Sequence, residues 1–305
     1  MNNLDNTAVS THLGKTSTYA RAYDPTLLVR ELRQNNRDHL GFNLTTLPFV
    51  GVDLWNAWEV SILNALGVPI NGFIKILYPA NSRYIVESKS LKLYLNSFNM
   101  HQSSFVHPGE VFQSLQQVIT ADLSALLDTN VTVGMFLSSK SRQIAESKHV
   151  ITDLFEFTTL ESVLDLNECV CTQYKETPSL IEYTQNHHPV EVKYHSSLLK
   201  SNCRVTSQPD WGDIYIYYKG SNIVQPASLL KYIVSFRDEC HFHEEICETV
   251  YTRLLNTLKP EKLMVTCLYL RRGGIDINPI RATSADLIYS VFTDANESYS
   301  KTLRQ

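Results

Sequence analysis

The sequence contains an internal repeat, and this feature constrains the fold more than any other. Residues 85–98 read IVESKSLKLYLNSF and residues 223–236 read IVQPASLLKYIVSF, an offset of 138 without a gap. Seven of the fourteen positions are identical, whereas chance in a chain of ordinary composition would give about one match. We therefore expect two related units in tandem, each built on the same plan.

The segments around each copy follow a common order. Runs rich in β-branched and aromatic residues predict strands at 54–63, 72–78 and 130–137 in the first unit and at 189–199, 213–218 and 263–270 in the second. Apolar residues at helical spacing predict a helix before the last strand of each unit, over 111–126 and 246–258, with Pro260 ending the second. The order of strand, strand, helix and strand predicts an α+β fold with helices on one face of an antiparallel sheet.

The chain is therefore expected to consist of two modules joined by a connector. We assign residues 1–140 to the first module, 141–175 to the connector and 176–305 to the second module. The sequence EFTTL at 156–160 indicates that the connector is partly ordered. Sheet edges in modules of this kind favour pairing with a second chain, so a homodimer is expected.

The composition excludes several broad classes of protein. The net charge of −4 gives no general attraction to nucleic acid, and no stretch approaches the ~20 apolar residues of a membrane span. Residues 1–18 are polar and carry no apolar signal segment, so a cytoplasmic protein is expected. The six cysteines are then expected to be reduced, each being a packing residue, a metal ligand or a nucleophile.

The two copies of the repeat differ in ways that suggest a shared site. Residues 87–89 read ESK in the first copy, whereas the matching residues 225–227 read QPA. Residues 242–244 read FHE before the helix of the second unit, and the first unit has no such trio. Because neither unit holds a full polar set, we expect one site assembled from both halves.

Cys203 and Asp210 form the candidate pair for catalysis. Cys203 follows an apolar strand, and Asp210 lies seven residues later. Trp211 and Gly212 predict a turn-like bend that would bring the thiol and the carboxyl group to one substrate atom. The thiolate would attack that atom and the carboxyl group would donate a proton. A packing cysteine and an ordinary turn aspartate are the alternative interpretation.

His243 and Glu244 stand at the start of the second predicted helix. An adjacent imidazole and carboxylate can recognise the edge of a heterocycle, with Glu244 accepting hydrogen bonds from N–H groups. A solvated first turn, where a glutamate suits the helix dipole, explains the same residues. A third interpretation places Cys240, His243 and Cys247 on one helix face as metal ligands.

Cationic residues occur at two places that can approach a phosphate. Residues 271–274 read RRGG, a loop expected after the last strand whose backbone can come close to an anion. Lys89 and Lys92 form a second cationic pair in the first unit. Ordinary surface charge is the alternative. The sequence has no GxGxxG motif, so a Rossmann dinucleotide domain is not expected.

Four motifs together resemble those of one known family. They read ESKSLKLYLNSF at 87–98, LLKSNCRVTSQPDWG at 198–212, SFR…FHE within 235–244 and RRGGIDINP at 271–279. In this order they closely resemble the two-module NADPH-dependent 7-cyano-7-deazaguanine reductases of queuosine biosynthesis, and LPFVGVDLW at 47–55 fits the same pattern. The resemblance implies tandem tunnelling-fold (T-fold) modules and an oxidoreductase that uses NADPH to reduce the nitrile of 7-cyano-7-deazaguanine to the aminomethyl group.

The resemblance also implies roles for individual residues. Cys203 would form a covalent thioimide with the nitrile carbon, and Asp210 would donate the proton. The implied substrate contacts are Val86, Glu87, Ser88, His243 and Glu244, and the implied NADPH contacts are Ser88, Lys89, Arg272 and Gly273. This mechanism needs no metal, its substrate is a small molecule, and no direct contact with nucleic acid is expected.

Two other functions remain open on the sequence. A zinc-dependent, cyclohydrolase-like hydrolase of the same fold would need Cys240, His243 and Cys247 to bind metal. A non-catalytic purine-binding module would keep its function when Cys203 is replaced by alanine. Zinc content and the effect of Cys203→Ala separate these functions from the reductase.

Overall fold

Nine strands form one sheet within the described part of this computed structural model, which comprises residues 20–42, 46–138, 156–297 and 305. Eight follow the order β5-β3-β2-β11-β10-β8-β7-β6, and β9 pairs with β7. Their bounds are β2 Val50–Leu63, β3 Pro69–Pro79, β5 Thr132–Leu137, β6 Thr158–Thr159, β7 Tyr183–Cys203, β8 Pro209–Val224, β9 Cys240–His241, β10 Lys262–Tyr269 and β11 Ile275–Ala282. A separate pair joins β1 (Arg30–Leu32) to β4 (Tyr84–Val86).

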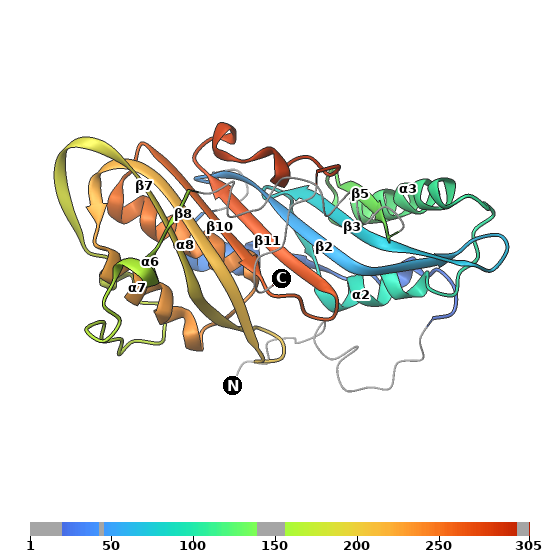
Figure 1. The fold of residues 1–305 in the computed structure, drawn as a ribbon, viewed down its shortest axis with the longest axis horizontal. Helices are drawn as coiled ribbons and strands as arrows, with labels where there is room; N and C mark the ends of the chain where they lie inside the picture. Colours follow the sequence, from blue (N-terminus) through green and yellow to red (C-terminus); the bar gives the residue numbers. More distant parts are fainter. Residues whose placement is uncertain (1–19, 43–45, 139–155, 298–304) are drawn as a thin grey trace.

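Helices of both halves cover the same face of this sheet (Figure 1). The longer ones among the described residues are α2 Ser88–Ser97, α3 Pro108–Leu127, α7 Pro226–Val234 and α8 His243–Leu258. Shorter segments are α1 Gln34–Arg37, α6 Leu160–Val163, and the 3-10 turns η1 Pro25–Leu27, η2 Asp38–Leu40, η4 Pro178–Leu180, η5 Ser235–Asp238, η6 Ala285–Leu287 and η7 Ser290–Phe292. In Figure 1, α2 and α3 accompany the strands of the first half, and α7 and α8 those of the second.

The alternation of side chains along β10 explains why the sheet has two buried faces. Leu263 and Val265 point to the helix side, where they belong to the apolar core around α7 and α8. Met264 and Leu268 point the other way and pack near Phe292 of η7. Because successive side chains of a strand face opposite sides, a run that is apolar at every position predicts burial on both faces.

The internal repeat folds as two matching helix entries. The first copy leads from β4 into α2, and the second leads from β8 into α7. Ser90 Oγ donates a hydrogen bond to the carbonyl of Glu87 (2.7 Å), and Ser228 Oγ donates to the carbonyl of Gln225 (2.8 Å). Each hydroxyl also accepts a backbone N–H from a residue far back in the chain, Val29 before β1 (3.0 Å) and Glu182 before β7 (3.1 Å). The identical serines therefore anchor the same local structure in both halves.

The two halves meet where β2 pairs with β11. Eight antiparallel residue pairs join residues 50–57 of β2 to the whole of β11. Gly51 lies in this seam, where an added Cβ would come within 2.2 Å of the carbonyl oxygen of Ile280. A glycine is therefore required for the two strands to approach this closely.

Buried charges add to the contact between the halves. Arg281 of β11 bonds to Asp53 of β2 (2.8 Å) and to Glu248 of α8 (2.7 Å). Arg37 from the first half bonds to the same Glu248 carboxylate (2.6 Å). All four side chains are at most 3% exposed. Removing one member would leave an uncompensated buried charge, so the network fixes how the halves join.

The structure confirms the predicted fold class. The sheet is antiparallel apart from the short pairings of β6 and β9 with β7, and it carries its longer helices on one face. The predicted strands correspond to β2, β3, β5, β7, β8 and β10, and the two predicted helices correspond to α3 and α8. The repeated segments themselves, to which the sequence pattern assigned no structure, form α2 and α7.

Two local predictions are wrong. The strand predicted at 263–270 is not the last of the second unit, because β11 follows it from Ile275. This strand lies between β2 and β10, and the sequence conceals it because Pro279 interrupts the run and a proline inside a run argues against a strand. The predicted bend at Trp211 and Gly212 lies within β8, and the chain turns earlier, at 204–208.

The division into modules stays a prediction. Residues 1–19 and 139–155 lie outside the described residues, and the second range includes the first part of the connector. The later part of the connector contains β6 and α6, in agreement with the order expected at 156–160. The sheet runs without interruption from one half to the other.

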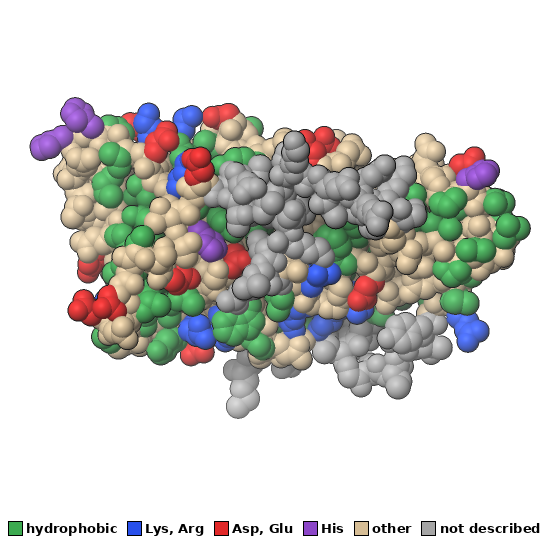
Figure 2. Space-filling model, viewed as in Figure 1, with side chains coloured by type: hydrophobic (Ala, Val, Ile, Leu, Met, Phe, Trp, Pro, Cys, Tyr) green, Lys and Arg blue, Asp and Glu red, His purple; other side chains and the backbone are tan. Residues whose placement is uncertain are grey.

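In the described part of the chain, no helix is both long and apolar enough to cross a membrane. On the face shown in Figure 2, acidic and basic side chains are interspersed rather than gathered by sign. This distribution agrees with the small net charge of −4.

Candidate active site

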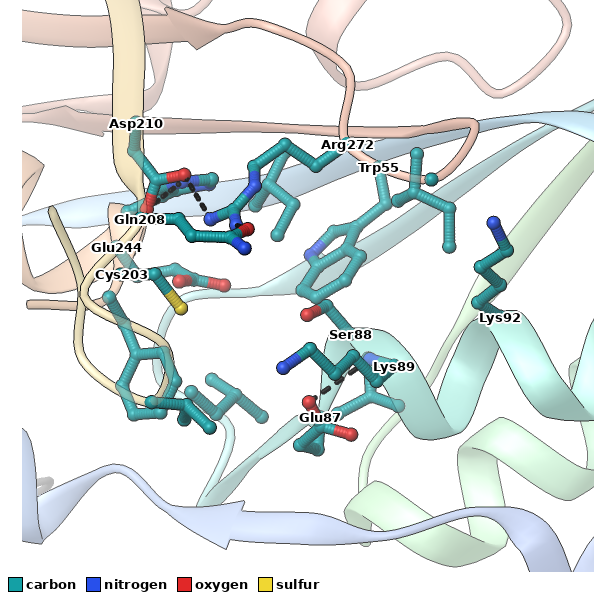
Figure 3. Close-up of a pocket in the computed structure, with 18 of the residues that line it drawn as sticks. Trp55, Glu87, Ser88, Lys89, Lys92, Cys203, Gln208, Asp210, Glu244 and Arg272 are labelled. Atoms are coloured by element: carbon teal, nitrogen blue, oxygen red, sulfur yellow. Dashed lines mark hydrogen bonds and ion pairs between the residues drawn. The ribbon is translucent and has the colours of Figure 1, made fainter. Parts of the chain in front are cut away.

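A cavity of about 310 Å³ lies at the junction of the two halves (Figure 3). Residues at the start of α2 in the first half form one wall, and the β7–β8 hairpin with the start of α8 forms another. The turn between β10 and β11 closes a third side. The predicted site between the halves is thus present as a cavity, and its volume suits a small heterocycle.

Cys203 is the last residue of β7, and its sulfur points into the cavity (Figure 3). The chain reverses over 204–208, where Cys203 N–H donates to the Gln208 carbonyl (2.8 Å) and Ser207 adopts a positive φ of 54°. Burial and the charge of Asp210 act to raise the pKa of the thiol. Hydrogen bonds to the sulfur from the Thr206 hydroxyl and the backbone of Val205 and Thr206 outweigh them, so the pKa of Cys203 lies below its ordinary value.

Asp210 faces the same cavity from the second residue of β8. Its side chain is 3% exposed and has two polar partners: Arg272 Nη1 donates to Oδ1 (2.6 Å), and His243 Nε2 lies 3.3 Å from Oδ2. Burial would raise the pKa of this carboxyl group, but the contacts with His243 and Arg272 lower it below the ordinary value. Asp210 is therefore a carboxylate in this arrangement.

His243 and Glu244 begin α8, as predicted, and line the cavity side by side. His243 stacks on Tyr269 with ring centroids 3.8 Å apart. Burial, with the charge of Asp53, raises the pKa of Glu244 to about 7. Among the described residues, Glu244 Oε1 has no hydrogen-bond partner. A buried acceptor without a donor is suited to an N–H group supplied by a ligand.

Glu87, in contrast, already has partners. It is the N-cap of α2, and its carboxylate accepts hydrogen bonds from the backbone N–H groups of Lys89 (3.0 Å) and Ser90 (2.7 Å). Each carboxylate oxygen retains a second lone pair for a ligand. Val86 and Ser88, on either side of Glu87, also line the cavity.

Cationic groups also line the cavity. The Lys89 ammonium group is buried and, within the described residues, has no hydrogen-bond partner. Arg272 precedes Gly273 and Gly274, which have φ values of 59° and 79°. A Cβ on Gly273 would come within 2.9 Å of Lys92 Nζ, so glycine keeps this turn close to the lysine. An orphaned ammonium group and a guanidinium group that line the same cavity fit a phosphate-bearing cofactor such as NADPH.

Trp55 and Gln208 are among the cavity residues that were not singled out from the sequence. Trp55 of β2 is 1% exposed, and its indole N–H has no hydrogen-bond partner among the described residues. Gln208 lies in the turn after Cys203 and accepts a hydrogen bond from Arg272 (2.5 Å). Trp55 lies within the motif at 47–55 that resembles the family pattern. That its side chain points toward a cavity depends on the pairing of β2 with β11, which no local sequence pattern predicts.

The structure does not assemble the alternative zinc ligands. Cys247 is buried, with its thiol donating to backbone carbonyls of Val265 and Pro279, whereas Cys240 is exposed in β9. His243 faces Asp210 instead. The i, i+3, i+7 spacing fails because the helix begins at His243, so Cys240 lies outside it. The described residues contain no group of three or more metal-ligating side chains placed to hold an ion.

Comparison with known proteins gives matches in both halves. A family model described as "Nitrile reductase, 7-cyano-7-deazaguanine-reductase N-term" matches residues 19–135, and one described as "QueF-like protein" matches residues 209–286. The NADPH-dependent 7-cyano-7-deazaguanine reductase of Rickettsia akari is 42% identical over 285 residues, which is 92% of this chain and 95% of its own. The chain belongs to this family.

Relatives from other bacteria give the same result. The reductase of the same name from Hydrogenovibrio crunogenus is 40% identical, covering 90% of this chain and 93% of its own. That from Paraburkholderia phymatum is 42% identical, covering 88% and 92%. A solved apo structure of the archaeosine synthase QueF-Like matches 32% of this chain and 95% of its own, with a TM-score of 0.28 and 16% identity.

Proposed function

We propose that this protein reduces the nitrile of 7-cyano-7-deazaguanine to the aminomethyl group with NADPH, as a step of queuosine biosynthesis. The observation that carries the proposal is the Cys203 sulfur, which faces the shared cavity under hydrogen bonds that lower its pKa. Membership of the reductase family supports the same conclusion. A deazaguanine has N–H groups that can occupy the free acceptor on Glu244.

Cys203 would begin the reaction as a nucleophile. Its thiolate adds to the nitrile carbon, a C–S bond forms, and the C≡N bond becomes C=N while the nitrogen takes up a proton. The resulting thioimide carbon accepts hydride better than the nitrile does and is fixed in position. Bound NADPH would supply the hydride: after the first transfer the C–S bond breaks and frees Cys203, and a second equivalent, with two protons in all, would complete the reduction to the amine.

Asp210 would carry the proton for the first step. As a carboxylate it can take the proton of the Cys203 thiol and then release it to the nitrogen, so no external acid is consumed. Its pairing with His243 (3.3 Å) holds the carboxylate toward the cavity. The proposed substrate contacts on the other wall are Val86, Glu87 and Ser88, with Ser88, Lys89, Arg272 and Gly273 for the cofactor.

Incubation with the nitrile alone tests the proposal. We expect a mass increase of one substrate, confined by peptide mapping to Cys203 and absent in Cys203→Ala. Cys240→Ala is the matched control, because Cys240 is exposed and does not line the cavity. No adduct together with no oxidation of NADPH would refute the mechanism. Unchanged function in Cys203→Ala would favour a purine-binding module instead.

Variants of the remaining groups separate binding from chemistry. Asp210→Asn is expected to slow turnover far more than it weakens substrate binding, because the amide cannot transfer the proton. Glu244→Gln is expected chiefly to raise KM, because an N–H group of the substrate loses its charged acceptor. Equal effects of both substitutions on kcat and KM would contradict these roles.

The assembly and compartment are also proposals. We propose a cytoplasmic homodimer that does not bind nucleic acid directly, since β5 ends the strand order of the sheet and leaves an edge for a second chain. Light scattering coupled to gel filtration gives the oligomeric state, and a monomer at working concentration would contradict it.

A further inference from the structure

Arg272 contacts more of the catalytic apparatus than a cofactor ligand requires. Its guanidinium donates to Asp210 Oδ1 (2.6 Å), to Gln208 Oε1 (2.5 Å) and to Thr206 Oγ1 (3.4 Å). Thr206 in turn hydrogen-bonds the Cys203 sulfur. One side chain therefore reaches both the proposed proton carrier and the turn that holds the nucleophile (Figure 3).

We propose that Arg272 is a positioning residue that couples cofactor binding to proton transfer: it keeps Asp210 as an ion-paired carboxylate until an anionic cofactor competes for the guanidinium group. This inference rests on the proposed function, because it assigns Arg272 to the cofactor and Asp210 to the proton. Arg272 cannot bind the cofactor and hold its full contact with Asp210 at the same time, so the pairing of Asp210 changes when the cofactor binds.

Arg272 and Asp210 differ in how freely their side chains can move, and this difference decides which of them moves when an anion binds. Asp210 is 3% exposed and fixed within β8, whereas the Arg272 side chain is 30% exposed on a turn. Gly273 and Gly274 follow it with positive φ values. Lys92 and the buried Lys89 ammonium group border the same region, so an anion there has further cations to bind. Arg272 can move toward an anion, and Asp210 cannot follow it.

The charged and titratable groups that face Asp210 define the effect. They are Arg272, His243, Cys203 and the hydroxyl of Tyr269. When Arg272 turns to an anion, Asp210 loses a cation that stabilises its charged form, and the carboxyl group holds a proton more readily. The thiol proton of Cys203 can then pass to Asp210 and on to the nitrile nitrogen as the C–S bond forms. Adduct formation is thereby favoured when the hydride donor is present.

The pH profile of adduct formation tests this coupling without turnover. The rate of the Cys203 adduct is measured by rapid quench and mass spectrometry, with the nitrile alone, between about pH 5 and about pH 9. Loss of one ion pair raises the pKa of a carboxyl group by about one unit or more. The pH profile of Arg272→Gln is therefore expected to move by about one pH unit toward higher pH. NADP⁺, which cannot deliver hydride, is expected to move the wild-type profile in the same direction and to leave that of Arg272→Gln unchanged.

Two further variants distinguish charge from structure. Arg271→Gln is the matched control, because the Arg271 guanidinium lies over the Trp58 ring (5.1 Å) and its profile should coincide with that of the wild type. Arg272→Lys restores a cation next to Asp210 and should restore most of the wild-type profile. Identical profiles for Arg272→Gln and wild type, or equal shifts by NADP⁺ in both, would overturn the inference. Absence of any adduct in the wild-type protein would instead refute the proposed function.

Discussion

Replacing Glu244 with glutamine is expected to change the stability of the ligand-free protein in a pH-dependent way. Glu244 is 4% exposed, and burial with the charge of Asp53 raises its pKa from 4.5 to about 7. An acid whose pKa is higher in the folded state favours folding when protonated and opposes it when ionised. The folded protein therefore loses stability as the pH rises from the unfolded pKa through about 7. Glutamine removes this dependence.

The size of the effect follows from the shift. Each pKa unit corresponds to about 1.4 kcal/mol, so full ionisation of Glu244 costs the folded state about 3 kcal/mol at alkaline pH. At about pH 5 the cost is about 1 kcal/mol, because the unfolded chain is only partly ionised there. The difference in unfolding free energy between Glu244→Gln and wild type should thus change by about 2 kcal/mol from about pH 5 to about pH 8. Any constant cost of burying the amide cancels in this comparison.

Urea denaturation at the two pH values measures the change directly. Thr252→Val is the control on the same helix, since the Thr252 hydroxyl donates to the Glu248 carbonyl (2.7 Å) and does not titrate, so its stability difference should be the same at both pH values. A stability difference for Glu244→Gln that is the same at both pH values would refute the reasoning. So would a change in the opposite direction.

Three further outcomes are expected. Substrate affinity should rise about tenfold per pH unit up to the Glu244 pKa of about 7 and level off above it, as measured by calorimetry, and a flat profile would exclude Glu244 as the charged acceptor. The indole N–H of Trp55 is expected to donate to a ligand, so Trp55→Phe should raise the Kd of that ligand by about tenfold with little loss of stability. Separate titrations with the nitrile and with NADP⁺ identify the ligand. An unchanged Kd for both would show that the N–H is unused. Arg281→Met should lower the unfolding free energy by about 3 kcal/mol or more because Asp53 and Glu248 each lose a buried partner. Denaturation at neutral pH measures this loss, and an unchanged midpoint would contradict it.

The sequence predicted the elements that depend on local pattern. The repeat at 85–98 and 223–236 indicated two related halves, and β10 and α8 follow directly from apolar periodicity. The prediction of one site between the halves agrees with the presence of a cavity that takes Glu87 from one half and Cys203 from the other.

The sequence could not predict features that arise from long-range pairing. The strand β11 contains buried polar residues that look like a loop until β2 and β10 pair with it on both sides. The pairing of Arg272 with Asp210 depends on the hairpin of β7 and β8 meeting the turn after β10. Neither the resemblance nor the spacing indicated that these two residues, expected to serve cofactor and proton transfer separately, are in contact.

The register in which β2 pairs with β11 sets how the two walls of the cavity are placed relative to each other. In this pairing Trp55 stands opposite Ile277, and both line the cavity. A slip of two residues keeps every side chain on its proper face but displaces one half by about 7 Å along the other. The thiol and the wall that should hold the heterocycle would then no longer serve the same molecule, although both halves stayed folded. Inactive variants that retain full stability should therefore be sought first among substitutions at this boundary.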